Sequence, residues 1–272
     1  ESARLVLKAK AGFSEAQTNT GEANRVGDLI ESELTSLGVD GEYRLSPKFK
    51  FGAGVKYANK DYVTFENSVA DNTVITLPFD LFYELTPKLD VSAGFTYSDR
   101  EVEDREGAAG SGYDSETYFY SVGLRGDLLP KLNGSVKAGY RTRERDGGED
   151  KSTLGIDADL TWSMTPKLTS KLIAGRDFGI AGTGESTERT SLRIISSYMI
   201  NTQYSASANL GYTLREYLDA SNREDDLYNA GVSLSYVPNK YWRFTTGYSY
   251  TDNQSNEAGR SYENNRIDLS AS

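Results

Sequence analysis

Apolar and polar side chains alternate along most of this chain with a period of two residues. From Leu132 to Tyr140, and again from Leu154 to Trp162, apolar residues occupy every second position with few exceptions. Such alternation predicts a β-strand with one apolar and one polar face. The pattern recurs in eight further segments: 49–57, 75–83, 89–97, 118–124, 192–200, 204–212, 228–236 and 242–250. The strands run to ten or more residues, longer than the usual strand of about five or six, so we expect an all-β protein of long strands.

Six short turns, five of them with proline and most with lysine, divide these segments into pairs. They are residues 46–48, 86–88, 129–131, 165–167, 201–203 and 238–240. Their steps of 40, 43, 36, 36 and 36 residues indicate one repeated unit. Each step has room for two strands and one longer loop, which is a β-hairpin. Seven hairpins predict about 14 antiparallel strands, and 12 or 16 remain possible.

Two irregularities are expected within this pattern. The alternation between Val26 and Leu45 slips near Thr35, which makes the first hairpin the least regular one. Pro78 lies inside a strand and cannot donate a hydrogen bond to the sheet, so we expect a β-bulge there.

Aromatic residues recur at two fixed distances from the turns. Ten residues after the middle of each turn the chain has Tyr57, Tyr97, Tyr140, Arg176, Tyr212 and Tyr248. A second set, close to the turns, includes Trp162, Tyr236 and Trp242. Ten tilted strand residues cover about 25 Å, which matches the apolar band of an outer-membrane barrel and its two aromatic girdles. The spacing favours a transmembrane antiparallel up-and-down β-barrel over a soluble β-sandwich.

The longer loops of such a barrel are expected outside the cell, with the short turns and both termini in the periplasm. The longer loops lie near residues 14–26, 58–71, 99–116, 144–151, 181–188, 215–227 and 252–263. They are acidic: residues 99–116 contain seven carboxylates and two arginines. One interpretation is a mouth that favours cations or binds calcium among lipid phosphates. The favoured interpretation is a solvated loop surface.

Composition narrows the chemistry further. The 272 residues show no linker or shift in composition, so residues 1–272 are expected to form one outer-membrane barrel domain. Cysteine and histidine are both absent, which removes the usual nucleophile, base and metal ligands, so no enzyme activity, metal or cofactor is expected. Asp157 and Asp159 lie on the same strand face, as any two residues two positions apart do, so their spacing is no evidence of a catalytic pair of carboxylates. The net charge of −10 argues against nucleic acid as a partner.

The polar face of the predicted barrel carries charges of both signs. The candidates for lining its lumen are Lys50, Lys56, Asp90, Arg125, Lys137, Arg141, Asp157, Asp159, Lys171, Arg193, Arg243 and Arg266. They could surround a water-filled diffusion pore, or they could pair across the interior and close it. About 14 strands lies between barrels filled by side chains and open channels, so strand number leaves both possibilities open.

Two stretches of the chain resemble the putative β-barrel porin 2 family. They are residues 235–250, with Val237-Pro238-Asn239-Lys240, and residues 160–167, with Met164-Thr165-Pro166-Lys167. The resemblance is strongest from about Thr73 onward. It implies an outer-membrane barrel of Gram-negative bacteria, and several members are encoded beside exopolysaccharide genes. It therefore adds polysaccharide-export components to the expected partners, which are otherwise outer-membrane lipid and lipopolysaccharide; the oligomeric state stays open.

The functional expectation is a passive porin-like channel, or a polysaccharide-export conduit, for hydrophilic solutes. The alternative is a structural or adhesive barrel with a plugged lumen and acidic loops that contact ions or matrix. Barrels of this kind usually end in an aromatic residue, whereas Ser272 is the last residue here. We expect the natural protein to continue a few residues to an aromatic one, and this chain to be a mature or trimmed form.

Overall fold

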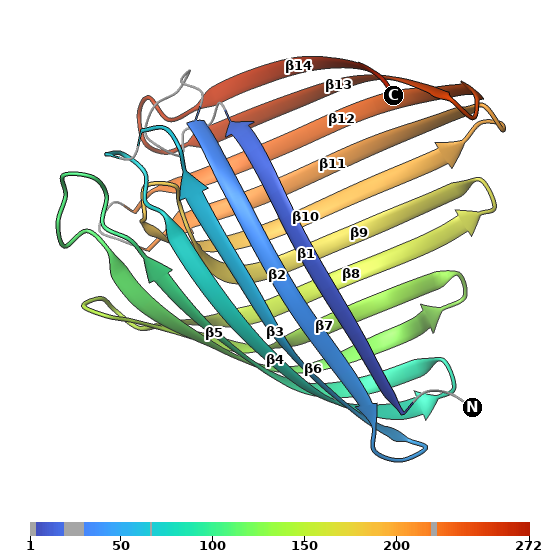
Figure 1. The fold of residues 1–272 in the computed structure, drawn as a ribbon, viewed down its shortest axis with the longest axis horizontal. Helices are drawn as coiled ribbons and strands as arrows, with labels where there is room; N and C mark the ends of the chain where they lie inside the picture. Colours follow the sequence, from blue (N-terminus) through green and yellow to red (C-terminus); the bar gives the residue numbers. More distant parts are fainter. Residues whose placement is uncertain (1–3, 19–29, 66, 219–221) are drawn as a thin grey trace. The chain divides into compact units, whose positions relative to one another are not determined.

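The computed structural model describes residues 4–18, 30–65, 67–218 and 222–272, and in these residues the chain folds into 14 antiparallel β-strands without a helix (Figure 1). No helix long and apolar enough to cross a membrane is therefore present among them. Each strand is hydrogen-bonded to its neighbours in sequence, in the order β1 to β14. The strands are β1 (Leu5–Thr18), β2 (Ile30–Arg44), β3 (Phe49–Tyr62), β4 (Asn72–Thr86), β5 (Leu89–Val102), β6 (Tyr113–Leu129), β7 (Leu132–Arg145), β8 (Lys151–Thr165), β9 (Leu168–Ile180), β10 (Ser186–Met199), β11 (Tyr204–Tyr217), β12 (Glu224–Asn239), β13 (Trp242–Ser255) and β14 (Tyr262–Ala271). The predicted all-β, 14-stranded, up-and-down fold is confirmed.

The register of β1 with β2 runs without a shift from Leu5, opposite Tyr43, to Thr18, opposite Ile30. The irregular alternation near Thr35 therefore reflects which side chains are apolar and involves no bulge. Residues 26–29 of the expected long strand, and residues 19–26 of the first expected loop, lie outside the described residues.

The bulge predicted at Pro78 is wrong. Pro78 pairs with Thr96 of β5 in a register that is continuous around it. On the β3 side the register is the same before and after the proline, from Ala53 opposite Phe79 to Lys56 opposite Thr76. Gly54 gives the proline ring room, since a Cβ there would lie 3.3 Å from Pro78 Cγ. The strand therefore absorbs the missing donor without gaining a residue.

Several of the short turns contain a side-chain oxygen that accepts hydrogen bonds from the backbone just after it. Ser46 Oγ, for example, accepts from the backbone N–H groups of Lys48 and Phe49, at 3.3 and 3.1 Å. Thr165 and Asn201 accept in the same way from the second and third residues after them. Ser, Thr and Asn side chains stabilise turns by such bonds. The residues 201–203, which lack proline and lysine, therefore make an equivalent turn.

The sixth turn lies slightly later than predicted. Pro238 belongs to the end of β12, where the register shifts between Tyr236 and Asn239. Asn239 Oδ1 accepts from the Tyr241 backbone N–H at 2.9 Å. Asn239 therefore takes the acceptor position of this turn.

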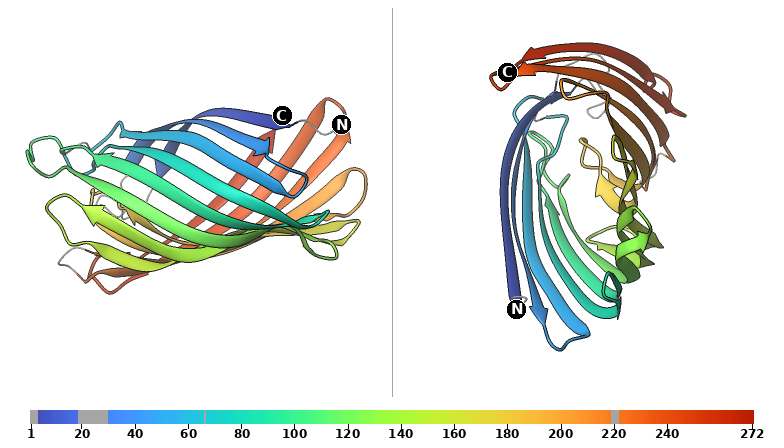
Figure 2. Two further views of the ribbon diagram at one scale, coloured as in Figure 1. Left: turned by 90° about the horizontal axis from the view of Figure 1, so that it is seen from below. Right: turned by 90° about the vertical axis from the view of Figure 1, so that its right-hand side faces the viewer.

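The described chain divides into two compact units. Unit 1 comprises residues 1–125, 137–156 and 177–187, and unit 2 comprises residues 126–136, 157–176 and 188–272. Strands β1–β5 belong wholly to unit 1 and lie side by side as long strands in Figures 1 and 2. Strands β11–β14 belong wholly to unit 2, and β6–β10 contribute to both. That residues 1–272 form one domain stays a prediction.

Burial in unit 1 is reversed relative to a water-soluble protein. On the apolar face Val122 and Tyr140 are 67% and 58% exposed. On the polar face Asp90, Arg141 and Arg143 are 6%, 7% and 4% exposed. Charged residues are almost never fully buried in soluble proteins unless they are paired. A buried polar face and an exposed apolar one are what a strand needs when its outer surface contacts lipid.

Aromatic side chains on the apolar face of unit 2 pack at two heights. Near the turns, Tyr204 stacks on Tyr236 with ring centroids 4.5 Å apart. Eight residues further along β11, Tyr212 contacts Tyr228 at 5.3 Å. Eight strand residues correspond to about 26 Å along the strand. With a strand tilt of about 40° this becomes about 20 Å along a barrel axis, slightly less than the apolar band of about 25 Å. The position of the two aromatic levels in a membrane stays a prediction.

An arginine on the apolar face is expected to destabilise the protein according to its depth. Val232→Arg, about midway between the two aromatic levels, should lower the free energy of unfolding by about 2–4 kcal/mol, because the charge meets hydrocarbon. Tyr241→Arg, in the adjoining turn, should cost about 1 kcal/mol or less. Equilibrium unfolding from lipid vesicles measures both values. Val232 and Tyr241 are both exposed, at 59% and 73%, so equal small effects would contradict lipid contact.

Candidate functional site

The candidate site lies on the polar face of unit 1, where acidic residues stand opposite glycines. Asp40 of β2 pairs with Gly54 of β3, and Glu42 pairs with Gly52. Asp80 of β4 in turn lies between Gly52 and Gly94 in the register. An added Cβ at Gly54 would lie 2.6 Å from Asp40 Oδ1, and one at Gly94 would clash with Asp80 Oδ1. The glycines therefore make room for the carboxylates themselves.

A chain of ion pairs crosses the same polar face. Asp90 of β5 lies at its centre and is bound by Lys50 Nζ at 3.0 Å and by Arg125 Nη2 at 2.8 Å. Arg125 also binds Glu42 Oε2 at 2.7 Å, and Lys50 lies 3.8 Å from Glu84. The Asp90 side chain is only 9% exposed. A buried carboxylate is tolerated because two cations neutralise it.

These bonds join strands that are not neighbours. Arg125 of β6 reaches Glu42 of β2, and Lys137 of β7 binds Asp80 of β4 at 2.6 Å. In a flat sheet β2 and β6 would lie about 19 Å apart, at 4.8 Å for each step between strands. The bond therefore requires unit 1 to curl toward its polar face, and the charged side chains lie inside the curl.

Arginines of the polar face also stack on aromatic rings. The guanidinium of Arg125 lies 3.7 Å from the ring centroid of Phe82, and that of Arg141 lies 4.1 Å from that of Phe119. Phe82 and Phe119 are 5% and 4% exposed. Sequence reasoning missed these phenylalanines as site residues. Their signal was an aromatic on the polar side of the alternation, where an arginine from a neighbouring strand can cover the ring.

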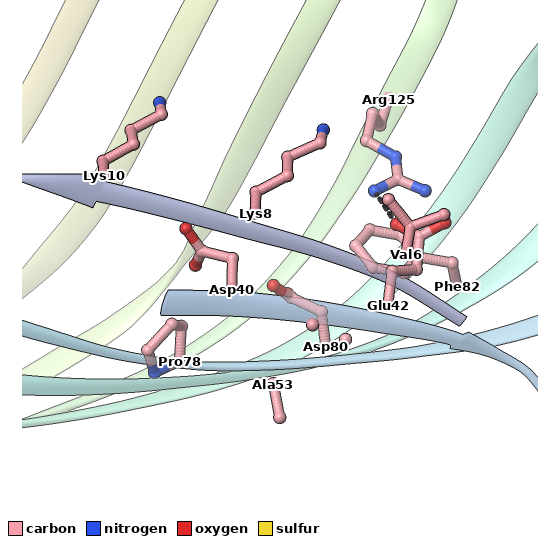
Figure 3. A pocket seen from close by; sticks show the side chains of 12 residues that line it. Val6, Lys8, Lys10, Asp40, Glu42, Ala53, Pro78, Asp80, Phe82 and Arg125 are labelled. Carbon is pink, nitrogen blue, oxygen red and sulfur yellow. Dashed lines mark hydrogen bonds and ion pairs between the residues drawn. The ribbon is translucent and has the colours of Figure 1, made fainter. Parts of the chain in front are cut away.

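A recess of 460 Å³ opens beside the ion pairs (Figure 3). Lys8 and Lys10 project into it from β1, and Arg125 and Phe82 form its wall. Its volume falls within the usual range of small-molecule sites, about 300–1,000 Å³. The recess lies in the half of unit 1 nearest the short turns, since Lys50 and Glu84 are close to the turns at 46–48 and 86–88.

The structure brings some of the predicted lumen residues together and separates others. Lys50, Asp90 and Arg125 form the central ion pairs, with Lys137 bound to Asp80 and Arg141 stacked on Phe119, whereas Lys56 lies exposed on β3. In unit 2, Asp159 binds Lys171 at 2.8 Å and Arg266 binds Asp268 at 3.0 Å. Asp157, Arg193 and Arg243 lie on β8, β10 and β13 without joining the central ion pairs.

The predicted girdle residues all lie on the apolar side of the alternation. Tyr57 and Tyr97 lie on β3 and β5, Tyr140 on β7, Trp162 on β8, Tyr212 on β11, Tyr236 on β12, and Trp242 and Tyr248 on β13. Tyr97 contacts Tyr118 of β6 with ring centroids 5.5 Å apart. Trp242 lies parallel to Phe244 at 6.0 Å.

At the opposite end of unit 1, two long loops pack on each other. The Ala70 backbone N–H, in the β3–β4 loop, donates to the Gly182 carbonyl, in the β9–β10 loop, at 2.8 Å. Val69, Ala70 and Ala181 are each 2% exposed. Strands β5–β8 separate the two loops in the sheet order. We call this contact of residues 69–70 with residues 181–184 the loop bridge; sequence reasoning did not predict it.

The acidic β5–β6 loop is held by its own backbone. Asp104 accepts from the Gly110 and Gly112 backbone N–H groups at 3.0 and 2.6 Å. These bonds, first that of Gly110, hold the pKa of the Asp104 carboxyl below its ordinary value. The carboxylate thus organises this loop, which agrees with a structured, solvated loop surface. No group of three or more residues able to hold a metal ion is found in the described part of the chain.

Comparison with known families identifies the family of the chain. The family model "Putative beta-barrel porin 2" matches residues 63–272, which is most of the chain. The chain belongs to this family. A search of curated protein sequences finds no significant relative.

Solved structures of outer-membrane proteins share the fold. The outer membrane channel DcaP of Acinetobacter baumannii is 13% identical, with a TM-score of 0.53, and the match covers 100% of this chain and 97% of DcaP. The copper transporter OprC is 12% identical, with a TM-score of 0.57, and the match covers 98% of this chain and 53% of OprC. The FrpB iron transporter from Neisseria meningitidis is 10% identical, with a TM-score of 0.53, over 92% of this chain and 50% of FrpB. This family member therefore has the strand architecture of an outer-membrane barrel, at about half the length of the two transporters.

Removing the central carboxylate should destabilise the protein. Asp90→Asn leaves Lys50 and Arg125 close together without their shared anion, so the free energy of unfolding should fall by about 2–3 kcal/mol. Asp268→Asn is the matched control, because Asp268 and Arg266 are exposed, and should cost less than about 1 kcal/mol. Urea titrations of both variants in vesicles measure the difference. Equal losses would show that the Asp90 ion pairs add nothing.

The loop bridge depends on Gly184, whose φ is +84°. An added Cβ would lie 3.1 Å from Ala70 Cβ, so Gly184→Ala should loosen the contact and speed hydrogen exchange in residues 67–71 and 181–187. Gly107→Ala is the control, since Gly107 has a similar φ of +76° and nothing within 4 Å of the added atom. It carries the same backbone strain without the clash. Unchanged exchange in Gly184→Ala would refute the role of this close approach.

Proposed function

We propose that this family member is a passive outer-membrane channel for hydrophilic solutes. The observation that carries the proposal is the reversed burial of unit 1, where charged groups such as Asp90 and Arg141 are buried on the polar face. A face that is polar and turned away from lipid is the lumen of an outer-membrane barrel. Under this proposal the predicted lumen residues line the path, and the protein is not an enzyme.

The orientation follows from loop length. Short turns face the periplasm in bacterial barrels, and longer loops face outward. The recess and its ion pairs then lie toward the periplasm, and the loop bridge lies at the outer mouth. Both termini are periplasmic in this arrangement. Lipid and lipopolysaccharide surround the apolar face as the immediate partners.

The size of the solute is limited by the charged side chains. The pair Arg125–Glu42 and the pair Lys137–Asp80 both reach across intervening strands of unit 1. Side chains that span a curved sheet occupy space a solute would need, which favours small solutes. Passage of a polysaccharide, together with export components as partners, is the wider form of the proposal. It is supported by the resemblance to family members encoded beside exopolysaccharide genes.

A structural or adhesive barrel with a plugged lumen is the second candidate. The loop bridge favours it, because Val69, Ala70 and Ala181 form a buried contact between loops that four strands separate. In this case the acidic loops would contact ions or matrix and no solute would pass.

Conductance in planar bilayers separates the two functions. A channel should give steady ohmic steps, and Arg125→Ala should enlarge them by removing the side chain that joins Glu42 to Asp90. Arg260→Ala is the matched control, because Arg260 is not among the lumen candidates and its partner Glu257 lies in the same loop, and its steps should equal those of the unmodified protein. Uptake of sugars of increasing size by vesicles then sets the size limit. Folded protein that stays silent in bilayers would reject the channel and favour the plugged barrel.

A further inference from the structure

Three lysines on the polar face of unit 1 differ from the other cations there. Within the described ranges of the chain, Lys8, Lys10 and Lys56 form no ion pair, and all three are exposed. The remaining candidates nearby, Lys50, Arg125 and Lys137, are each held by a carboxylate at 3.0 Å or less. The carboxylates of Glu42, Asp80 and Asp90 are thereby neutralised and do not compete for the three lysines.

The register places these lysines around one another. Lys10 of β1 stands opposite Gly38 of β2, and Gly38 stands opposite Lys56 of β3. The two lysines are thus separated by one strand that has no side chain at that point, with Cα atoms about 10 Å apart. Lys8 precedes Lys10 by two residues on the same face of β1, and both lysines line the recess (Figure 3).

One carboxylate faces this group. Asp40 is opposite Lys8 in the register, yet no ion pair forms between them. The three lysines therefore outnumber Asp40, the one described carboxylate near them that is not in an ion pair, and the local charge is positive. This contrasts with the net charge of −10 of the whole chain and with its acidic loops.

We propose that Lys8, Lys10 and Lys56 form a binding site for the anionic group of a small solute, a carboxylate or a phosphate. Lysine ammonium groups bind such oxygens as point charges with three donors each. The missing side chain at Gly38 leaves room for the anion between Lys10 and Lys56. The adjoining recess of 460 Å³ accommodates the rest of a small molecule.

The lysine site makes small anions the substrate class of the proposed channel. This inference rests on the proposed function, because solute reaches the site only if the lumen is open. Its electrostatic consequence is a preference for anions in the half of the lumen nearest the short turns. A cluster of like charge in a low-dielectric cleft raises the local concentration of counter-ions. The preference should weaken as salt screens the lysines.

Binding of inorganic phosphate to the detergent-folded protein tests the site directly. Calorimetry should show saturable binding that weakens about tenfold or more in the variant Lys8→Gln/Lys10→Gln/Lys56→Gln, since loss of about 1.4 kcal/mol corresponds to tenfold. The variant Lys8→Arg/Lys10→Arg/Lys56→Arg keeps the charge and should keep the binding. A third variant, Lys131→Gln/Lys167→Gln/Lys240→Gln, removes the same charge from the short turns and should change nothing. Circular dichroism confirms that each variant folds.

Conductance in a KCl gradient distinguishes failure of the site from failure of the channel. In the unmodified protein the zero-current potential should show chloride preference, which the first variant should lower several-fold. Phosphate binding without conductance would reject the channel and keep the site. Conductance with phosphate affinity that is absent, or equal in the unmodified protein and the first variant, would overturn the site and keep the channel.

Discussion

The structure depends on the reversal of the usual relation between burial and polarity. Apolar residues such as Val122 and Val232 are exposed, whereas charged residues of unit 1 such as Asp90 are covered on the opposite face. In lipid every backbone polar group must be bonded within the protein, so β-strands can cross only when they are paired along their length. Alternation with a period of two then follows, because one face of each strand meets hydrocarbon and the other meets water or protein.

Burying charge on the covered face is possible only because the charges bind one another. Asp90 joins Lys50 and Arg125, and Arg125 continues to Glu42, so one chain of bonds crosses from β3 to β5, β6 and β2. Since these strands are not all neighbours, the bonds also hold the curl of unit 1. Gly54 and Gly94 serve the same end by leaving space for the carboxylates of Asp40 and Asp80.

The sequence was sufficient for the strands and insufficient for the contacts across them. Period-two alternation and turn spacing predicted 14 strands and the face of each residue, because both are local properties of the chain. Glu42, one partner of Arg125, is 83 residues away in sequence and four strands away in the sheet. Alternation shows which face a side chain is on, but it does not show which residue on another strand the side chain contacts. The bulge predicted at Pro78 failed for a related reason, since Gly54 on the next strand accommodates the ring. The loop bridge involves residues 69–70 and 181–184, which no pattern connects.

The ion pairs that stabilise the polar face do not include all of its lysines. Carboxylates near the short turns are taken up by Lys50, Lys137 and Arg125, so the cations left over on β1 and β3 retain their charge and their hydrogen-bond donors. With Asp40 as the one described carboxylate there without an ion pair, the three lysines leave the polar face positive at that level even in an acidic protein. Under the proposed channel function, selectivity would be set by these few residues beside the ion pairs, rather than by net charge or by the acidic loops.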